Sequence, residues 1–276
     1  MKHIILILTG LVIILSSIGC ISNSASSAVI QVNSAEELIN AIGPNRTIQL
    51  SAGDYMLSDV DDRYMKYLRW DPEFDGNTIT IRNVKNLKII GAQDQVTRLL
   101  VYPRYVYVLN FEGCQGVTLE NLTLGHFPEA GNCASGVIGA TKCSSLAVRH
   151  CDLFGCGTEG LSLEEVKGVI FHDSIIRDCT YGIMTLKSCR NLNFTQSTFT
   201  RNKEFWAVNI HDSQDVAFTD CDFTNNQARG EAFFSIVSSS NVLIKECQFA
   251  DNNIDTIANI KKAVIIDNTE GTQPGR

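Results

Sequence analysis

The sequence has no excess of positive charge. It carries 23 Lys and Arg residues against 30 Asp and Glu residues, which gives a formal net charge of -7 at pH 7. Proteins that bind nucleic acid usually present a basic stripe to the phosphate backbone. The charge balance therefore predicts that nucleic acid is not a partner. With 276 residues, 44% of them hydrophobic, the chain can fill one large core or two small ones.

Long apolar runs are missing after the first twenty residues. Residues 1–20 are typical of an export signal, because a charged start at Lys2 precedes an apolar stretch that is short for a membrane span. The stretch ends in Gly19-Cys20, which resembles the cleavage and lipidation box of bacterial lipoproteins. That resemblance implies a diacylglycerol on Cys20 and attachment to a membrane. Residues 17 and 18 depart from the box, so simple cleavage near residue 28 is the alternative. We expect residues 1–28 to form an export signal and tether.

No stretch sustains a helical period of 3.6 residues, which excludes coiled coils, Rossmann units and helical repeats. A different repeat is present. Its eight positions hold, in order, an apolar residue, any residue, an apolar residue, two polar residues, a small residue, any residue, and Leu, Ile or Phe. The copies recur at intervals of about 22 to 30 residues, starting at Leu87, Val117, Leu146, Val169, Leu192, Val216, Val242 and Val264.

Stacking the copies places like residues in columns. A second strand in each copy alternates inward apolar and outward polar positions, as in Leu161, Ser162 and Leu163. An asparagine column follows the apolar one at a bend, where Asn tolerates left-handed backbone and can bond its neighbours. The three predicted columns are Leu124, Leu153, Ile176, Phe199, Phe223 and Phe249; Leu122, Cys151, Ser174, Ser197, Cys221 and Cys247; and Cys156, Cys179, Asn202, Asn226 and Asn252.

These columns resemble those of the pectate-lyase-like, right-handed parallel β-helix superfamily over about residues 45–268. The resemblance implies an all-β fold, a single right-handed parallel β-helix solenoid of about eight turns. Residues 29–44 are expected to form a strand and a capping helix, since Ser34 and Glu37 match a capping box. Residues 269–276 are expected to be a disordered tail. The superfamily contains lyases, hydrolases, epimerases and proteins without known activity, so it implies no single function.

Nine cysteines remain once Cys20 is set aside, and an odd number cannot pair completely within one molecule. Parallel side chains on adjacent turns keep their Cβ atoms farther apart than a disulfide prefers. We therefore expect buried free thiols, with disulfides as the alternative, and no zinc site. The pairs that share a column are Cys114 with Cys143, Cys156 with Cys179, and Cys221 with Cys247.

Two long segments interrupt the repeat. Residues 55–77 mix aromatic and charged side chains, which suits sugar recognition or packing over the first turns. In residues 125–133, His126, Glu129 and Cys133 lie close enough in sequence to bind a metal or to serve acid-base chemistry, with a rigid structural turn as the alternative.

A polar face is expected on the outside of the second strand. Glu164, Lys187 and His211 fall in one column, and Tyr181 and Trp206 lie at the bends that lead into the strand. Such a face, edged by aromatic rings, suits an extended polysaccharide. The alternative is a solvated ladder of charges. A corner that brings Arg149-His150 and His172-Asp173 together on neighbouring turns suggests a general base, or else a solvated turn.

The resemblance also implies what a catalytic member needs: several Asp or Glu residues around calcium with a basic residue in the lyases, or clustered Asp residues in the hydrolases. Here Asp152 and Asp222 share an outward column but stand three turns apart, and Glu159 and Glu164 have neutral neighbours. We therefore expect an exported, lipid-anchored, non-catalytic protein without a cofactor, which presents its face to a polysaccharide or a cell-surface protein. The alternatives are a lyase or glycoside hydrolase acting on an acidic polysaccharide, with calcium only if a lyase, and a purely structural interaction module.

Overall fold

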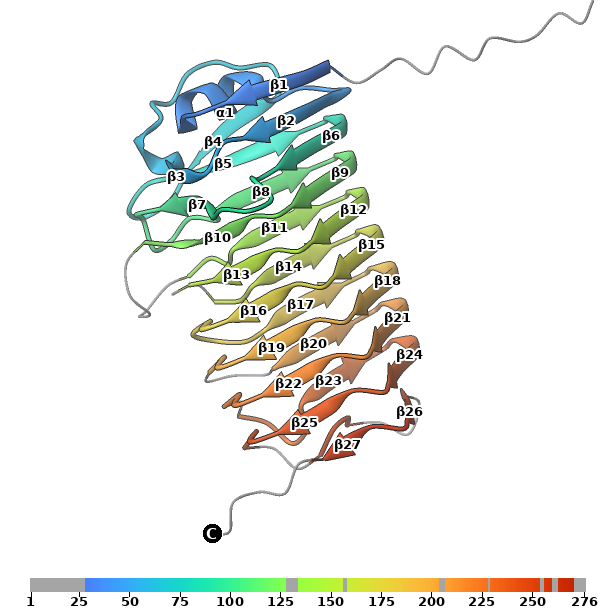
Figure 1. Ribbon diagram of the computed structural model, residues 1–276. Coiled ribbons are helices and arrows are strands. Elements are labelled where there is room, and N and C mark those ends of the chain that lie inside the picture. Colours follow the sequence, from blue (N-terminus) through green and yellow to red (C-terminus); the bar gives the residue numbers. More distant parts are fainter. Residues whose placement is uncertain are drawn as a thin grey trace, which may run out of the picture.

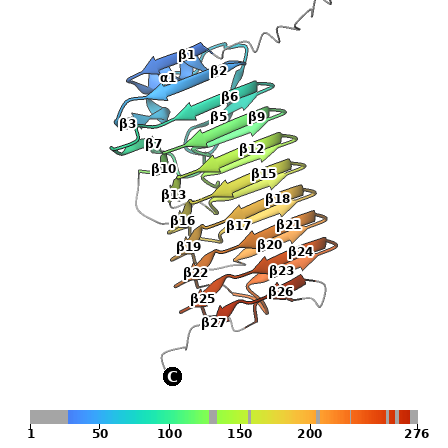
Figure 2. The same ribbon diagram turned by 45° about the vertical axis from the view of Figure 1, so that its right-hand side comes forward.

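The chain winds into a coil of stacked turns, with its N-terminal elements at one end and its C-terminal strands at the other (Figure 1). The computed structural model describes residues 28–127, 134–155, 158–203, 207–227, 229–253, 256–259 and 263–270. Most turns contribute one strand to each of three sheets, which we name A, B and C. Figure 2 shows sheet A running along the length of the coil.

The sheets are built from strands that are far apart in sequence. Sheet A holds β1 (Ala28–Val32), β2 (Arg46–Leu50), β6 (Lys85–Ile90), β9 (Gln115–Glu120), β12 (Ser144–Arg149), β15 (Lys167–His172), β18 (Arg190–Thr195), β21 (Gln214–Thr219), β24 (Ser240–Lys245) and β26 (Ala263–Ile266). Sheet B holds β3 (Gly53–Met56), β7 (Thr97–Val101), β10 (Thr123–His126), β13 (Asp152–Phe154), β16 (Ile175–Arg177), β19 (Thr198–Thr200), β22 (Asp222–Thr224), β25 (Gln248–Ala250) and β27 (Thr269–Glu270). Sheet C holds β4 (Leu68–Pro72), β5 (Asn77–Arg82), β8 (Leu109–Glu112), β11 (Ile138–Thr141), β14 (Leu161–Glu164), β17 (Met184–Lys187), β20 (Val208–His211) and β23 (Phe234–Val237).

The register of the strands confirms the repeat. Leu146 pairs with Val169, and Leu192 pairs with Val216, so equivalent positions of successive copies lie side by side. Among the described residues, neighbouring strands within the three sheets are parallel except β4 and β5, which pair antiparallel at the N-terminal edge of sheet C. A parallel stack buries one apolar face of each strand continuously, because each turn covers its neighbour.

Left-handed backbone forms the corners of the coil. From β9 onward, the residue that follows each sheet A strand has a positive φ, as in His150 (φ 50) and Asp173 (φ 44). A second such residue interrupts the pairing near the start of the strand, where Ser145 and Gly168 are skipped between paired positions. Asn, Asp, Ser and Gly tolerate this conformation better than other residues, which explains the polar pairs of the sequence repeat.

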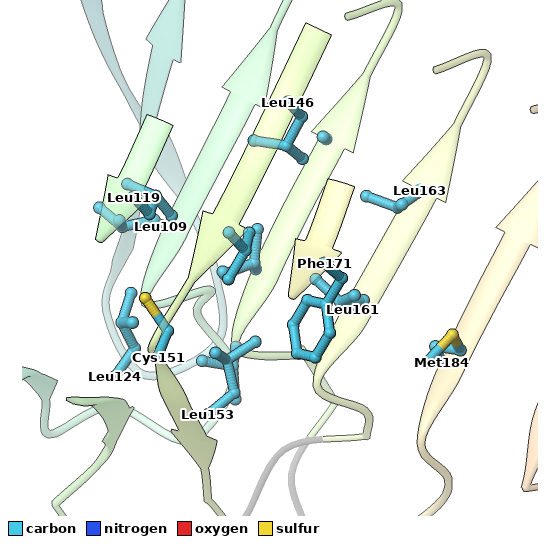
Figure 3. Packing of buried hydrophobic residues seen from close by; sticks show 14 of the residues in the cluster. Leu109, Leu119, Leu124, Leu146, Cys151, Leu153, Leu161, Leu163, Phe171 and Met184 are labelled. Atoms are coloured by element: carbon cyan, nitrogen blue, oxygen red, sulfur yellow. The ribbon is translucent and has the colours of Figure 1, made fainter. Parts of the chain in front are cut away.

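The interior contains columns of stacked side chains. The Phe199 and Phe223 rings are 4.8 Å apart, the Phe223 and Phe249 rings are 4.9 Å apart, and each pair is nearly parallel. Phe194 and Phe218 form a second stack at 4.5 Å. Figure 3 shows Leu, Phe, Met and Cys side chains of this core from successive middle turns, between Leu109 and Met184. Stacked rings add to the free energy of apolar burial.

The predicted asparagine ladder is present. The Asn202 Oδ1 accepts a hydrogen bond from the Cys179 amide (3.0 Å), and the Asn226 Oδ1 accepts from the Asn202 amide (3.1 Å). The Asn226 side chain donates to the carbonyl of Phe199 (2.8 Å), and Asn252 repeats the pattern one turn later. These side chains are buried, so each ladder residue supplies partners for backbone groups that water cannot reach.

The cysteines of the described residues are free and buried: Cys114, Cys143, Cys151, Cys179, Cys189, Cys221 and Cys247. Cys179 shares its column with the asparagine ladder, and the others fill interior positions that serine occupies in other turns. The Cys151 amide donates to Ser174 Oγ (3.0 Å), as the Cys114 amide does to Cys143 Sγ (3.3 Å). Cys156, and with it one of the predicted pairs, lies outside the described residues.

The N-terminal end is covered by α1 (Ala35–Ala41), the predicted capping helix. Ser34 Oγ accepts from the Glu37 amide (3.2 Å), and the Glu37 carboxylate accepts from the Asn33 amide (2.7 Å). Leu38 and Ile39 are buried over the first turn. Among the described residues, no helix is long and apolar enough to cross a bilayer. Cys20 and the rest of the expected export signal lie outside the described residues.

One long segment follows one of its two sequence-based alternatives, and the C-terminal end differs from its expectation. The chain after Tyr55 contains a short 3-10 helix, η1 (Leu57–Asp59), and then the β4–β5 hairpin, which places Tyr67 and Trp70 against the core. This placement favours packing over sugar recognition for residues 55–77. At the other end, Thr269 and Glu270 belong to β27 and pair with β25, although they were expected in a disordered tail. The open edge of β25 supplies the backbone partners that order them.

Candidate functional site: the outer face of sheet C

Sheet C presents two columns of side chains to solvent, and we name this surface the sheet C face. Ser162 pairs with Thr185, and Thr185 pairs with Asn209. All three side chains are partly exposed, while Leu161 and Leu163 on either side of Ser162 are buried. From β8 onward, the columns are Asn110, Gly139, Ser162, Thr185, Asn209 and Ser235; and Glu112, Thr141, Glu164, Lys187, His211 and Val237.

The charged column contains the residues singled out from the sequence. Glu164, Lys187 and His211 occupy equivalent positions on three successive strands. Lys187 Nζ lies 2.6 Å from Glu164 Oε1, and both side chains are exposed to solvent. An exposed ion pair of this kind contributes little to folding. The placement is as predicted, and a role in binding stays a prediction.

A hydroxyl and carboxyl cluster lies beside these columns, and we name it the Glu159 cluster. Glu159 precedes β14, and its carboxylate is hydrogen-bonded to Thr185 and Ser162. Ser162 is also hydrogen-bonded to the hydroxyl group of Tyr107, which precedes β8. The four side chains therefore form one network that bridges three turns of the coil.

The Glu159 cluster depends on two glycines, Gly136 and Gly139, in the turn between Tyr107 and Glu159. A Cβ atom at Gly136 would lie 3.2 Å from the Tyr107 ring and 3.4 Å from Glu159 Cγ. At Gly139, a Cβ would lie 3.1 Å from the same ring and 2.5 Å from Asn110 Oδ1. The absence of side chains at Gly136 and Gly139 lets the ring reach across the intervening turn toward Ser162.

Electrostatics set the Glu159 carboxyl apart from the other acids of the face. Burial raises the pKa of Glu159 to about 6, and the hydrogen bonds from Thr185 and Ser162 lower it only part of the way back. Burial also raises the pKa of Tyr107, and the nearby Glu159 charge raises it further. The carboxyl can therefore bind and release a proton near neutral pH, which is what a general acid or base requires.

The sequence did not reveal this cluster. Glu159 was set aside because its sequence neighbours are neutral, yet a neutral environment is what raises the pKa of a carboxyl group. The available signal was positional, since Tyr107 and Glu159 stand two residues before their sheet C strands in the aligned repeat. Equivalent positions before parallel strands lie on the same edge of a sheet.

An ionic network occupies the N-terminal end of the face. Arg69 contacts Asp71 through Nε (2.5 Å) and Glu112 through Nη2 (2.7 Å). Thr80 donates to Asp71 Oδ2 (2.6 Å), and Asn110 donates to Thr80 Oγ1 (2.9 Å). The network ties the β4–β5 hairpin to β8, so these charges already have partners within the protein.

The other predicted binding residues have separate placements. Tyr181 is partly exposed in the turn that leads into β17, at the edge of the sheet C face. His126 is 1% exposed, and its Nε2 lies 2.9 Å from the carbonyl oxygen of Val106. Burial lowers the pKa of His126. This setting favours the structural alternative for His126. Glu129, Cys133 and Trp206 lie outside the described residues.

Within the described part of the chain, no cluster of three or more His, Cys, Asp or Glu side chains is arranged to hold a metal ion. Residues 128–133 lie outside that part.

Comparison with known proteins identifies proteins that have a similar fold. Residues 107–206 match the family model described as right handed beta helix region. A search of curated proteins finds no match to the sequence.

Three solved structures are similar to the chain. The catalytic domain of a GH87 alpha-1,3-glucanase in complex with tetrasaccharides has a TM-score of 0.58 and 11% identity over 90% of this chain and 46% of that chain. This chain thus spans about half the length of the glucanase domain. A pectin methylesterase in complex with a hexasaccharide has a TM-score of 0.50 and 9% identity over 83% and 81% of the two chains. Escherichia coli ybhc has a TM-score of 0.50 and 10% identity over 90% and 85%.

At these identities, similarity to solved structures concerns the fold and not the reaction. The family match covers the middle turns, and the sheet register extends the same winding to both sides of them. With its three parallel sheets and its repeat, the chain has the right-handed parallel β-helix fold, and its middle turns match the corresponding family model.

Proposed function

We propose that this chain is an exported, lipid-anchored protein that binds an extended polysaccharide along the sheet C face without cleaving it. The observation that carries the proposal is the polar column Ser162, Thr185 and Asn209, which repeats hydrogen-bonding groups at the spacing of the turns. Adjacent strands lie about 4.8 Å apart, close to the advance of one sugar unit in an extended chain. A regular ligand can therefore make the same contact on several turns.

Two further features support a carbohydrate ligand. Tyr181 and the ring of Tyr107 lie beside the polar column, and aromatic faces pack against the CH faces of sugars. The glucanase and the pectin methylesterase with the same fold were each solved with a bound oligosaccharide. The membrane anchor rests on the Cys20 motif in the sequence.

Glycan-array binding tests the proposal. The soluble chain that begins at residue 28 is applied to an array of neutral and acidic polysaccharides, together with Tyr181→Ala, Trp206→Ala and Thr185→Ala. We expect binding to one class of glycan and a loss of about tenfold or more in affinity in each variant. Asn193→Ala is the control, because Asn193 is exposed on β18 in sheet A. Unchanged binding in all three sheet C variants would remove this face as the binding surface.

The Glu159 cluster favours a second candidate, a polysaccharide lyase or hydrolase. A carboxyl with a pKa of about 6 can abstract a proton from a sugar ring or deliver one to a glycosidic oxygen. Tyr107, linked to it through Ser162, supplies a second proton donor within the same network. In this candidate Glu159 serves as the acid or base.

Release of unsaturated uronides, measured with and without calcium, and release of reducing ends separate the two candidates. Activity that disappears in Glu159→Gln, while glycan binding persists, would support the enzyme. Glycan binding with no product from any bound polysaccharide would support the non-catalytic proposal.

A further inference from the structure

A groove lies at the corner between sheets A and B, away from the sheet C face. In the later turns this corner is short: only Asn121 and Leu122 separate β9 from β10, and only His150 and Cys151 separate β12 from β13. Between β6 and β7 the connection is longer and runs through residues 91–96. This loop overhangs the corners of the following turns and encloses a groove of about 500 Å³. Ligand sites usually have volumes between about 300 and 1,000 Å³.

The overhanging loop is anchored at both ends. The Gly91 amide donates to the carbonyl of Glu120 (2.9 Å), and the Ala92 amide donates to Thr97 Oγ1 (3.0 Å). The carbonyl of Val96 accepts from the Gly53 amide (3.0 Å). A Cβ atom at Gly91 would lie 2.0 Å from the carbonyl oxygen of Asn121, so only glycine lets the loop leave the sheet at this point. These contacts hold the groove open without a ligand.

Planar polar groups line the groove. His150 Nδ1 lies 2.9 Å from Asp173 Oδ2, which fixes the imidazole on the floor. Amide and hydroxyl side chains repeat at the corners above and below. The polar lining residues include Asn121, Asp173 and Gln196 at the corners and Asp94 on the loop.

The charges of the groove select against anions. The residues that line it within the described chain include Asp94, Asp152 and Asp173 but neither Lys nor Arg. Arg177, which does not line the groove, binds both oxygens of Asp152 (2.9 and 2.8 Å). The carboxylates of Asp94 and Asp173 therefore repel a uronate or phosphate and accept hydrogen bonds from neutral hydroxyl groups.

Apolar side chains complete the site. Val96 on the loop is 63% exposed, and Ile175 on the floor is 37% exposed. Both are among the residues that line the groove. A sugar ring has hydroxyl groups around its edge and CH groups on its faces, which matches carboxylates and amides combined with exposed aliphatic groups. The corners from Asn121 to Gln196 extend over about 14 Å, enough for a short oligosaccharide.

From this geometry we propose that the groove between the 91–96 loop and the corners at His150 and Asp173 is a second binding site, which takes a neutral oligosaccharide. The site is separate from the sheet C face and uses none of its residues. It stands whether or not the sheet C face binds a glycan.

Calorimetric titration and saturation-transfer NMR test the site. The probes are neutral tetrasaccharides of glucose, mannose and galactose, with tetragalacturonate as the charged comparison. We expect at least one neutral probe to bind and tetragalacturonate not to bind at this groove. Asp173→Asn and His150→Asn should each weaken binding about tenfold, because the first replaces a charged acceptor oxygen by an amide group and the second replaces the imidazole by a shorter side chain. Asn is used because it accepts the left-handed backbone of these corners.

Asp220→Asn is the matched control, since Asp220 has the same corner position and a positive φ but does not line the groove. It should leave the affinity within about twofold, as should Tyr181→Ala on the sheet C face. Asp94→Asn on the loop gives a groove variant that leaves the corners intact. The proposal is overturned if no neutral probe binds at millimolar concentration, if tetragalacturonate binds more tightly, or if the groove variants bind as the control does.

Discussion

The carboxyl group of Glu159 is surrounded by hydroxyl groups rather than by cations. Its charged form is therefore poorly compensated, unlike that of Asp152, which is bound by Arg177 through two hydrogen bonds. A protein that needed only stability would have no use for a partly buried carboxylate here. Such destabilising charges are concentrated at functional sites.

Glu159→Gln should make the stability of the protein less dependent on pH. The pKa in the folded protein is about 6, above the ordinary value of 4.5. The stabilising contribution of the protonated carboxyl is thus complete below pH 4.5 and is lost as the pH rises through 6. One and a half pKa units correspond to about 2 kcal/mol.

Chemical denaturation at pH 4.5 and at pH 7.5 measures this difference. Relative to wild type, Glu159→Gln should gain up to about 2 kcal/mol in free energy of unfolding on going from the lower pH to the higher one. Glu164→Gln is the control, because its carboxylate is exposed and paired with Lys187. A pH dependence equal to wild type in Glu159→Gln would contradict the assigned environment.

At the scale of single elements, each turn is held to the next by more than strand pairing. The ladder side chain of Asn226 lies between the Asn202 amide and the carbonyl of Phe199. The side chain thus accepts from one backbone amide and donates to one backbone carbonyl at the bend after the sheet B strand. The ladder therefore fixes the bend between sheets B and C while the loops beyond it differ in length.

Asn226→Ala should reduce the free energy of unfolding by about 3 kcal/mol, because it leaves buried backbone groups without partners. Thermal and urea unfolding measure the loss. Asn193→Ala, at an exposed position of β18, should change the stability by less than about 0.5 kcal/mol. Similar losses in the two variants would show that the ladder bonds are not a special source of stability.

Much of the element arrangement could be predicted from the sequence. Like residues that recur at a near-constant interval predict stacked turns. The stacked rings of Phe199, Phe223 and Phe249 confirm this prediction. The capping helix followed from Ser34 and its apolar face. The alternation of buried and exposed side chains along the sheet C strands followed from the alternation of apolar and polar residues in the sequence.

Other elements could not be predicted in this way. The β4–β5 hairpin occurs once, so the repeat pattern could not predict it. Its two strands are antiparallel to each other. The Glu159 cluster joins Tyr107 to Ser162 across an intervening turn. Only the relative placement of three turns, together with the glycines between them, brings those groups together. The corner groove likewise depends on how one loop overhangs its neighbours.

On the scale of the whole molecule, the coil has two ends that expose strand edges. The N-terminal end is covered by α1 and β1, whereas β26 at the other end leaves Val264 51% exposed and Ile265 44% exposed. Uncovered edges invite pairing with other chains. The two ends therefore differ in their tendency to associate.

Removal of β1 and α1 should promote self-association. A chain that begins at residue 46 exposes the edge of β2 and the apolar residues beneath Leu38 and Ile39. Size-exclusion chromatography with light scattering should detect oligomers or aggregates, whereas a chain that begins at residue 28 should stay smaller at the same concentration. Identical masses for the two chains would refute a capping role.

Cys20→Ser should release the protein from the membrane fraction when the full chain is expressed in a bacterial host. The sulfur of Cys20 is the atom to which the predicted diacylglycerol is attached. Fractionation and incorporation of labelled fatty acid measure the effect, and Cys179→Ser at a buried position is the control. Label that persists in Cys20→Ser would exclude lipidation at this residue.

The stacking of successive turns has a consequence for how the protein folds during its synthesis. Each inner strand of a sheet pairs with the equivalent strand one turn earlier and one turn later. A folded turn can therefore serve as a template for the next turn before the later residues have been synthesised. Winding can therefore begin at the capped end and follow the chain as it emerges from a ribosome or a translocation pore. A nascent segment a single turn long is already sufficient to take its final place.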